Sequence, residues 1–353
     1  MLTKKQIKEI RDHLEKSQNP VFFFDNDPDG LCSFLLLQRW IGRGKGVPIK
    51  SFPGLNAEYF RKVHELKADY IFILDKPIVS EEFFSEVEKH NIPVVWIDHH
   101  IIDRESIPAF ANYYNPLFNK KKSNEPVTAL CYQVTAKKDD LWIAVMGCIS
   151  DRFLPKYYSE FQEKYSDLSI KTKDPYDVFY KSQIGKSTRI LGFGLKDRTT
   201  NVINMIRFLL KARDPYDVLV ENQKNHSFQK RFNQIKSIYD KLLYKAVSQA
   251  EPQKKLLFFQ YAGDMSISSE LSNELTYLFP EKIVVVVYVN GISANISIRG
   301  RISVKGKKSR DILLEAIKDI GDSTGGGHEY AAGGKMKTKD LEKFKDNLEK
   351  LIA

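Results

Sequence analysis

Cysteine is scarce in this sequence. Only three cysteines occur among 353 residues, at Cys32, Cys131 and Cys148, and no two of them form a CxxC pair. The odd number and irregular spacing exclude a disulfide framework and a zinc site built from thiolates. This composition is typical of a protein that works in a reducing compartment.

Long apolar runs are also missing. The most apolar run, IVVVVYV at residues 283–289, is far shorter than the roughly 20 residues that a membrane-spanning helix needs. The first residues mix charged with apolar side chains and contain no uninterrupted apolar segment of the kind found in secretory signals. We therefore expect a soluble, cytoplasmic protein without a membrane partner.

Acidic residues are fewer than basic ones. The chain has 55 Lys and Arg against 45 Asp and Glu, a net charge of +10, and 42% of its residues are hydrophobic. This hydrophobic content excludes a disordered chain, and the length predicts about two domains. The positive charge favours a polyanionic partner, nucleic acid above all, although charge that only keeps a protein in solution would look the same.

The hydrophobic pattern predicts an α/β protein in three parts. Strand-like runs alternate with helical patterns in the N-terminal part, which indicates βαβ units and a parallel sheet. The middle is rich in Lys, Asp and Tyr at helical spacing and lacks strand signals, so we expect a helical connector partly packed on the first domain. Strand signals return in a smaller C-terminal α/β domain, where a glycine-rich stretch at residues 321–334 is predicted to form a loop before a C-terminal helix. The three parts are predicted at residues 1–155, 156–250 and 251–353; the N-terminal strands at 21–24, 70–74 and 94–97; and the C-terminal strands at 255–261, 282–290 and 292–300.

Acidic residues follow all three N-terminal strands. The first strand runs into DNDPDG, the second into Asp75, and the third into Asp98, His99 and His100. The carboxyl ends of parallel strands lie at one edge of a sheet, so these groups should converge there. Clustered carboxylates repel one another unless a cation neutralises them, and oxygen ligands with one or two imidazoles suit Mn²⁺, and Mg²⁺ less well. Two such ions can together promote phosphoester hydrolysis, although acids after strands can also be simple turn residues.

These segments, in order, resemble the motifs of a known family. FFFDNDPDG, the isolated Asp75, VVWIDHH and MGCISDRFLP with Asp151 resemble the four motifs of the DHH phosphoesterase superfamily. GGGHEYAAGG, preceded by SIRG with Arg299, resembles the DHHA1 domain that accompanies it. The resemblance covers residues 20–155 and 255–340, and the DxDxDG form of the first motif is more similar to RecJ-type nucleases than to pyrophosphatases.

The resemblance implies a role for each matching residue. It implies two divalent metal ions, with Mn²⁺ preferred and Mg²⁺ or Co²⁺ possible, and with Asp75 as the bridging ligand. The implied catalytic residues are His100, Asp98 and Asp75. Of these, His100 would face the scissile phosphate. The implied metal ligands are Asp25, Asp27, Asp29, Asp75, Asp98, His99 and Asp151, and the implied substrate-binding residues are His100, Arg299, Gly325, Gly326, Gly327 and His328.

The resemblance also implies an activity. A RecJ-like exonuclease of the compact archaeal kind would release mononucleotides from single-stranded DNA or RNA, and replication or repair proteins such as a helicase are possible partners. A short-oligonucleotide or cyclic-dinucleotide phosphodiesterase would use the same groups, and a non-catalytic replication or repair scaffold could keep the same fold. The direction of digestion, the choice between DNA and RNA and the oligomeric state stay open.

Two further expectations concern charged side chains. Residues 292–310 hold six basic residues and no acid, which favours a tract for a polyanion over a solvated hairpin. Lys76 follows Asp75 directly, and we expect it to lie in solvent at the rim of the site rather than to point at the substrate.

Overall fold

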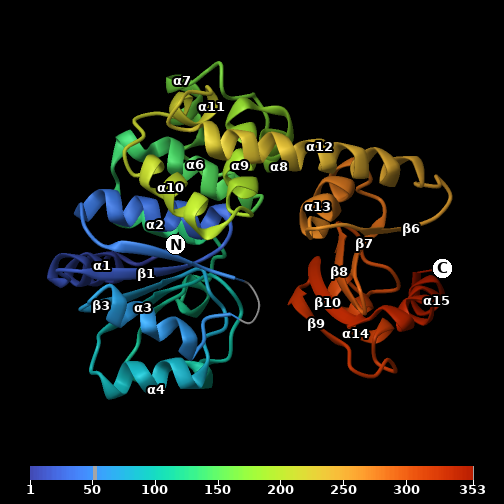
Figure 1. The fold of residues 1–353 in the computed structure, drawn as a ribbon, viewed down its shortest axis with the longest axis horizontal. Helices are drawn as coiled ribbons and strands as arrows, with labels where there is room; N and C mark the ends of the chain where they lie inside the picture. Colours follow the sequence, from blue (N-terminus) through green and yellow to red (C-terminus); the bar gives the residue numbers. More distant parts are fainter. Residues whose placement is uncertain (51–53, 353) are drawn as a thin grey trace. The chain divides into compact units, whose positions relative to one another are not determined.

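A five-stranded parallel sheet forms the centre of the N-terminal half of the chain. The computed structural model describes residues 1–50 and 54–352. The strand order is β2-β1-β3-β4-β5, every pairing is parallel, and the predicted parallel sheet is therefore confirmed (Figure 1). The strands are β1 (Pro20–Asp25), β2 (Lys45–Ile49), β3 (Tyr70–Leu74), β4 (Val94–Ile97) and β5 (Asn112–Tyr114).

Helices cover both faces of this sheet. In β1, Val21 and Phe23 face a core that includes residues of α3 and α4. On the other face, the ring centroids of Phe22 and Phe24 lie 5.4 and 5.2 Å from that of Phe34 in α2. Side chains alternate across a strand, so a strand that is apolar on both faces must be covered on both. Figure 1 shows α2 on one side of the sheet and α3 and α4 on the other. The helices of this part are α1 (Lys4–Lys16), α2 (Pro28–Ile41), α3 (Phe60–Glu65), α4 (Glu81–Lys89), α5 (Val127–Thr135) and α6 (Leu141–Ser150).

The middle of the chain is helical, as predicted. The described residues between α6 and the second sheet contain no strand. Tyr158 and Phe161, at helical spacing, are buried, because this face of their helix packs in the core. The helices are α7 (Tyr158–Lys164), α8 (Pro175–Lys181), α9 (Gln183–Gly194), α10 (Thr199–Leu209), α11 (Tyr216–Leu219) and α12 (His226–Ser248).

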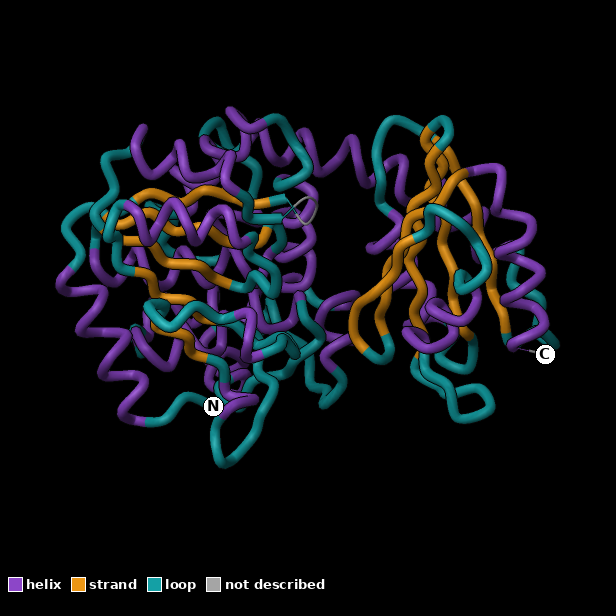
Figure 2. Tube along the Cα trace, turned by 90° about the horizontal axis from the view of Figure 1, so that it is seen from below, coloured by secondary structure: helices purple, strands orange, loops and turns teal. Residues whose placement is uncertain are grey.

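A second, mixed sheet forms the C-terminal part. Its order is β6-β7-β8-β10-β9, with β6 and β7 parallel and the other pairings antiparallel. Val and Ile of β7 and β8 pack against α14 and α15 in one core. Figure 2 shows the strands of each sheet side by side. The elements are β6 (Leu256–Ala262), α13 (Ser268–Leu278), β7 (Ile283–Asn290), β8 (Ser293–Gly300), α14 (Ser309–Ala316), β9 (Thr324–His328), β10 (Ala331–Lys337) and α15 (Leu341–Ile352).

The predicted glycine-rich loop is wrong. Residues 321–334 instead contain β9 and the first part of β10, paired antiparallel with Gly327 opposite Ala332 and Gly326 opposite Gly333. Glycine has no side chain to produce an alternating pattern, so the sequence carried no strand signal here. Tertiary contacts stabilise these strands instead: β10 pairs with β8, and Leu313 of α14 packs close to Gly325 of β9.

Two strands of the first sheet had no clear sequence signal. The edge strand β2 contains Lys45, Gly46 and Pro48, all uncommon in strands, and β5 has three residues. Both lie at sheet edges, where one neighbour is enough and proline is tolerated.

The chain divides into two compact units, Met1–Phe232 and Asn233–Ala353. The three-part division inferred from the sequence stays a prediction. No helix among the described residues is long and apolar enough to cross a bilayer.

Replacing Gly327 by alanine should destabilise the second sheet. Gly327 has φ +128°, and a Cβ atom there would lie 2.7 Å from the carbonyl oxygen of Ala331. A side chain in this backbone region costs about 1–3 kcal/mol. We expect Gly327→Ala to lower the free energy of unfolding by that amount in urea titrations of the full chain.

The neighbouring glycine provides a matched control. A Cβ atom at Gly326 would meet nothing within 4 Å, so Gly326→Ala should change stability by no more than about 1 kcal/mol in either direction. Equal effects of the two substitutions would show that the backbone of Gly327 carries no special constraint.

Candidate metal centre

Three adjacent strands deliver aspartates to one edge of the first sheet. Asp25 ends β1, Asp75 follows β3, and Asp98 follows β4. In the parallel register Phe24 pairs with Leu74 and Leu74 with Ile97, so the next residue of each strand lies at the same level. The predicted convergence of these residues is therefore a consequence of the strand order.

The start of α2 adds two more carboxylates. Asp27 caps the helix and accepts a hydrogen bond from the Gly30 amide at 2.9 Å. Asp29 is fully buried, and its two carboxylate oxygens accept hydrogen bonds from the amides of Val127 and Thr128 at 2.9 and 2.8 Å. Gly30 is required here, because a Cβ atom would lie 2.4 Å from the carbonyl oxygen of Asp25. The DNDPDG sequence thus combines a helix cap with a close approach between two backbones.

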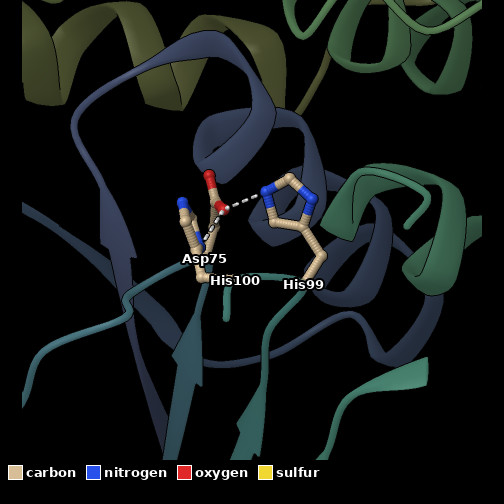
Figure 3. A group of neighbouring side chains, drawn as sticks. All are labelled: Asp75, His99 and His100. Atoms are coloured by element: carbon tan, nitrogen blue, oxygen red, sulfur yellow. Dashed lines mark ion pairs between the residues drawn. The ribbon is translucent and has the colours of Figure 1, made fainter. Parts of the chain in front are cut away.

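Asp75 lies between the two histidines. Its Oδ1 atom is 3.4 Å from Nε2 of His99 and 3.8 Å from Nδ1 of His100 (Figure 3). Asp151, at the end of α6, lies 3.5 Å from the same Nε2 atom of His99. Asp75 has φ +59°, a left-handed conformation that is costly for a residue with a side chain. This backbone aims its carboxylate into the cluster.

Three groups of side chains in this cluster could hold a metal ion. Within each group the candidate ligand atoms lie within 4.8 Å of one another. Asp75 belongs to two of the groups and His99 to two, which is the arrangement expected for adjacent ions with a shared ligand. The groups are Asp75, His99 and His100; Asp29, His99 and Asp151; and Asp25, Asp27 and Asp75.

Asp98 lies outside these three groups. One of its oxygens is 2.8 Å from Nδ1 of His100, and the other accepts a hydrogen bond from the Tyr113 hydroxyl at 3.2 Å. Burial would raise the pKa of Asp98, but its bond to His100 and the charges of the two histidines lower it. Burial opposes protonation of His100, yet the bond to Asp98 outweighs it and raises the pKa of the imidazole. Asp98 therefore holds His100 in place; its predicted role as a metal ligand remains a prediction.

The electrostatics of the cluster fit a divalent cation. Burial, followed by the charges of neighbouring aspartates, raises the pKa of Asp27 and of Asp75 well above the usual range. Burial and Asp151 raise the pKa of Asp29 to about 7. The Oδ1 atom of Asp75 is buried and accepts no hydrogen bond from any described residue. A buried acceptor without a donor, among oxygen and imidazole ligands, suits Mn²⁺ or Mg²⁺.

Lys76 does not lie at the rim. That prediction is wrong: Lys76 is 3% exposed, and its Nζ atom pairs with Oδ1 of Asp25 at 2.9 Å. The left-handed conformation of Asp75 breaks the alternation of side chains, which the sequence could not show. The Trp96 indole donates to the Lys76 carbonyl at 2.9 Å and fixes this segment. A resident ammonium group therefore neutralises one carboxylate of the cluster.

Two residues that support the histidines were not found from the sequence. Tyr113 binds Asp98, and Asn115 donates to the His100 carbonyl at 2.8 Å and to the Tyr113 hydroxyl at 2.9 Å. Both lie in or just after β5, the three-residue strand without a clear signal.

The predicted substrate-binding residues of the second unit lie on three neighbouring strands. Arg299 on β8 pairs with Ala331 on β10, and Ala331 pairs with His328 on β9. The guanidinium of Arg299 donates to Asn273, Ser269 and the carbonyls of Ile298 and Ala332. His328 is exposed, and Gly325, Gly326 and Gly327 belong to the edge strand β9.

The predicted basic tract at 292–310 is divided by the fold. Its first half is β8, while Lys307 pairs with Glu315 and Lys308 with Glu329. Acids outside the segment, in α14 and after β9, therefore neutralise part of a segment that itself contains none.

Two family models match the chain. The N-terminal domain of the DHH family matches residues 21–149, and the DHHA1 domain matches residues 240–353. This chain is a DHH-family protein with a DHHA1 domain. No curated protein matches the sequence.

Several solved structures share the fold of this DHH protein. RecJ from Thermus thermophilus in complex with Mn²⁺ has 16% sequence identity and a TM-score of 0.69, over 98% of this chain and 54% of RecJ. An exonuclease RecJ bound to manganese has 15% identity and a TM-score of 0.67, over 98% and 93%. A pGpG-specific phosphodiesterase from Vibrio cholerae has 11% identity and a TM-score of 0.51, over 95% and 99%. The chain spans about half the length of the Thermus protein, and at these identities the likeness shows the fold alone.

Mn²⁺ should stabilise the protein more at pH 8 than at pH 6. The raised pKa values of Asp27, Asp29 and Asp75 mean that the metal-free fold favours their protonated forms. Protonation of these carboxylates therefore stabilises the metal-free fold at low pH, and this stabilisation is lost as pH rises through about 7. A bound cation replaces those protons. At a hundred-fold excess over its Kd, Mn²⁺ should raise the Tm by about 5–10 °C at pH 8.

Thermal denaturation with and without Mn²⁺ measures this difference. Asp75→Asn should abolish most of the rise, whereas Asp264→Asn, at an exposed position in the second unit, should keep it. An Mn²⁺ effect that is equal at both pH values would contradict the titration of these carboxylates.

Lys76→Met should destabilise the metal-free protein. The substitution leaves the half-buried Asp25 carboxylate without its partner, and an acceptor left unsatisfied in this way costs about 1–3 kcal/mol. The exposed pair of Lys62 and Glu65 provides a control, because Lys62→Met should cost no more than about 0.5 kcal/mol. Urea denaturation in EDTA compares the two variants, and adding Asp25→Asn to Lys76→Met should restore part of the loss. Equal stability of the two lysine variants would argue against a structural ion pair at Lys76.

Proposed function

We propose that this protein is a metal-dependent exonuclease that removes mononucleotides from single-stranded DNA or RNA. It is a DHH phosphoesterase with an Asp and His cluster suited to metal binding. The observation that carries the proposal is the convergence of five aspartates, four of them buried or half-buried and Asp151 exposed, with His99 and His100 at one edge of the sheet. At their centre, Oδ1 of Asp75 accepts no hydrogen bond from a described residue.

Asp25, Asp27, Asp29, Asp75, His99 and Asp151 are the residues proposed to hold two divalent ions, with Mn²⁺ preferred. Bound divalent ions would supply a polarised phosphate and an activated water. The chain itself orients the imidazole of His100. Asp98, which accepts a hydrogen bond from Tyr113, contacts this imidazole and favours its protonated form. A cationic imidazole at this position is suited to stabilise charge on phosphoryl oxygens.

Three observations support a polynucleotide substrate. The fold is shared with two RecJ structures, both of which contain manganese, and one of them is described as an exonuclease. The net charge of +10 favours a polyanion. Arg299 on β8 and His328 on β9 lie on either side of β10 in the second unit, and they are proposed to contact phosphate, with the backbone of Gly325–Gly327 in the same edge strand as His328. Replication or repair proteins remain proposed partners.

A second candidate is a phosphodiesterase for short oligonucleotides or cyclic dinucleotides. The shared fold of the pGpG-specific phosphodiesterase favours it, since the same acid cluster could serve a two-nucleotide substrate. A non-catalytic scaffold is the third possibility, and it would not need to retain a cluster of carboxylates that repel one another.

Digestion of labelled single strands tests the proposal. With Mn²⁺, wild-type protein should release mononucleotides from a 30-mer of DNA or RNA. Asp75→Asn should remove the activity, and His100→Ala should lower it about 100-fold or more. Asp264→Asn, an exposed change outside the cluster, should leave it unchanged.

Chain length separates the candidates. Substrates from dinucleotide to 30-mer, labelled at either end, are compared under the same conditions. Activity confined to two to five nucleotides would replace the exonuclease by the short-substrate enzyme, and absence of both hydrolysis and Mn²⁺ binding would favour the scaffold.

A further inference from the structure

A cavity lined mainly by basic residues lies in the first unit, away from the acid cluster. Its volume is about 700 Å³, within the range of small-molecule sites. Its walls come from the C-terminal turns of α2, α7 and α10 and from the segments that follow α5 and α10. Six basic side chains and one carboxylate line it: Arg39, Lys137, Lys164, Arg207, Lys211 and Arg213, with Asp139.

Arg39 builds one wall of this cavity. Its guanidinium pairs with the buried Asp140 at 2.7 Å and donates to the carbonyls of Leu209, Leu210 and Ala212 at 3.0, 3.2 and 2.7 Å. These contacts satisfy carbonyls at the end of α10 and in the segment that follows it, and they tie that segment to α2. Arg39 therefore has a structural role, and any ligand must be bound by the other basic residues.

Helix termini do not account for the remaining positive charge. Basic residues are common in the last turn of a helix, where they offset about half a negative charge per terminus. Asp139 and Asp140 reduce the six positive charges to four, and three helix termini offset about one and a half more. A surplus of two to three positive charges is left in one concave site.

The surplus resides on side chains that other groups do not neutralise. Lys164, Arg207, Lys211 and Arg213 are exposed, and none forms an ion pair with a described residue. The guanidinium of Arg207 donates to the side-chain oxygen of Asn204 at 3.5 Å, and Nζ of Lys164 lies 5.3 Å from the ring centroid of Tyr165. Four cations held close together without partners repel one another, and a bound anion would relieve that repulsion.

The lining also limits the kind of anion. Among the described residues no aromatic side chain lines the cavity, so a nucleobase would find no ring on which to stack. Arginine forks match phosphate oxygens in pairs, and two of the unpaired cations are arginines. The chemistry thus favours several phosphate groups close together over a single charge or a base.

The cavity and the acid cluster lie at opposite ends of one helix. Asp27 and Asp29 stand at the start of α2, whereas Gln38, Arg39 and Gly42 at its end line the cavity. A helix of 14 residues is about 20 Å long. A ligand in the cavity would therefore be separate from any ion in the cluster.

We propose that this cavity binds a compact oligophosphate, the phosphate tail of a nucleoside polyphosphate or an inorganic polyphosphate. Lys137, Lys164, Arg207, Lys211 and Arg213 supply the positive charge, and the Arg39 wall holds their helices in place. The site is independent of the proposed hydrolysis, because none of its residues belongs to the acid cluster.

Calorimetric titration of the full chain tests the proposal. Inorganic tripolyphosphate and ATP are the probes, in EDTA so that no divalent ion can link phosphate to the acid cluster. We expect one site per chain, at least ten-fold weaker in Arg207→Ala/Arg213→Ala and changed less than two-fold in Lys224→Ala/Lys230→Ala. The second variant is a matched control, since it removes the same charge at exposed positions outside the cavity.

The two probes distinguish the sources of the oligophosphate. Equal affinity for both supports recognition of phosphates alone, and tighter binding of ATP supports a nucleoside polyphosphate. Absence of binding for both probes, or equal weakening in both double variants, would overturn the proposal. So would binding of a 20-nucleotide single strand alone, because the cavity would then be part of a nucleic-acid surface.

Two further measurements separate this site from the acid cluster. Asp75→Asn should bind tripolyphosphate as the wild type does, and Arg207→Ala/Arg213→Ala should keep its Mn²⁺-dependent rise in Tm. Loss of tripolyphosphate binding in Asp75→Asn would overturn the assignment of a separate site, whereas absence of nuclease activity would leave it intact.

Discussion

Repulsion among crowded carboxylates at one sheet edge is the constraint on which the N-terminal unit depends. Asp25, Asp27, Asp29, Asp75 and Asp151 lie in groups whose ligand atoms are within 4.8 Å of one another, and burial raises the pKa of several of them. Such a cluster is unfavourable unless positive charge compensates it. Lys76 supplies one positive charge, and the amides at the start of α5 stabilise Asp29 by donating hydrogen bonds to it. One oxygen of Asp75 accepts no hydrogen bond from any residue that the structure describes.

The rest of the unit serves to hold these groups together. Parallel pairing of β1, β3 and β4 places their ends in line, and the cap at Asp27 brings α2 to the same edge. The left-handed Asp75 and the crowded Gly30 are costly features that packing must sustain. α2 then continues to the basic cavity, so a single helix links a negatively charged site to a positively charged one.

The two histidines show how similar neighbours acquire different roles. His99 and His100 are adjacent in sequence, but burial lowers the pKa of His99 while the bond to Asp98 raises that of His100. One imidazole is suited to bind a cation in its neutral form, and the other is suited to face an anion. The burial of His99 and the contact of His100 with Asp98, which Tyr113 also binds, create the difference, and neither can be inferred from the sequence DHH alone.

The sequence by itself determined the α/β class and the grouping of the acidic residues. Apolar runs with acids at their ends are local features, and parallel pairing brings those ends together whatever the details of packing. Tertiary structure decided the fate of Lys76, of the glycine-rich segment and of the basic tract. Lys76 turned inward because of one backbone angle, β9 formed because β10 was available to pair with it, and Lys307 and Lys308 met Glu315 and Glu329 from other elements. The basic cavity belongs with these, since its cations come from four separate segments of the chain. The ion-pair partner of a charged residue and the pairing partner of a strand such as β9 come from other elements of the chain. Local sequence patterns cannot predict them, because the fold decides which elements meet.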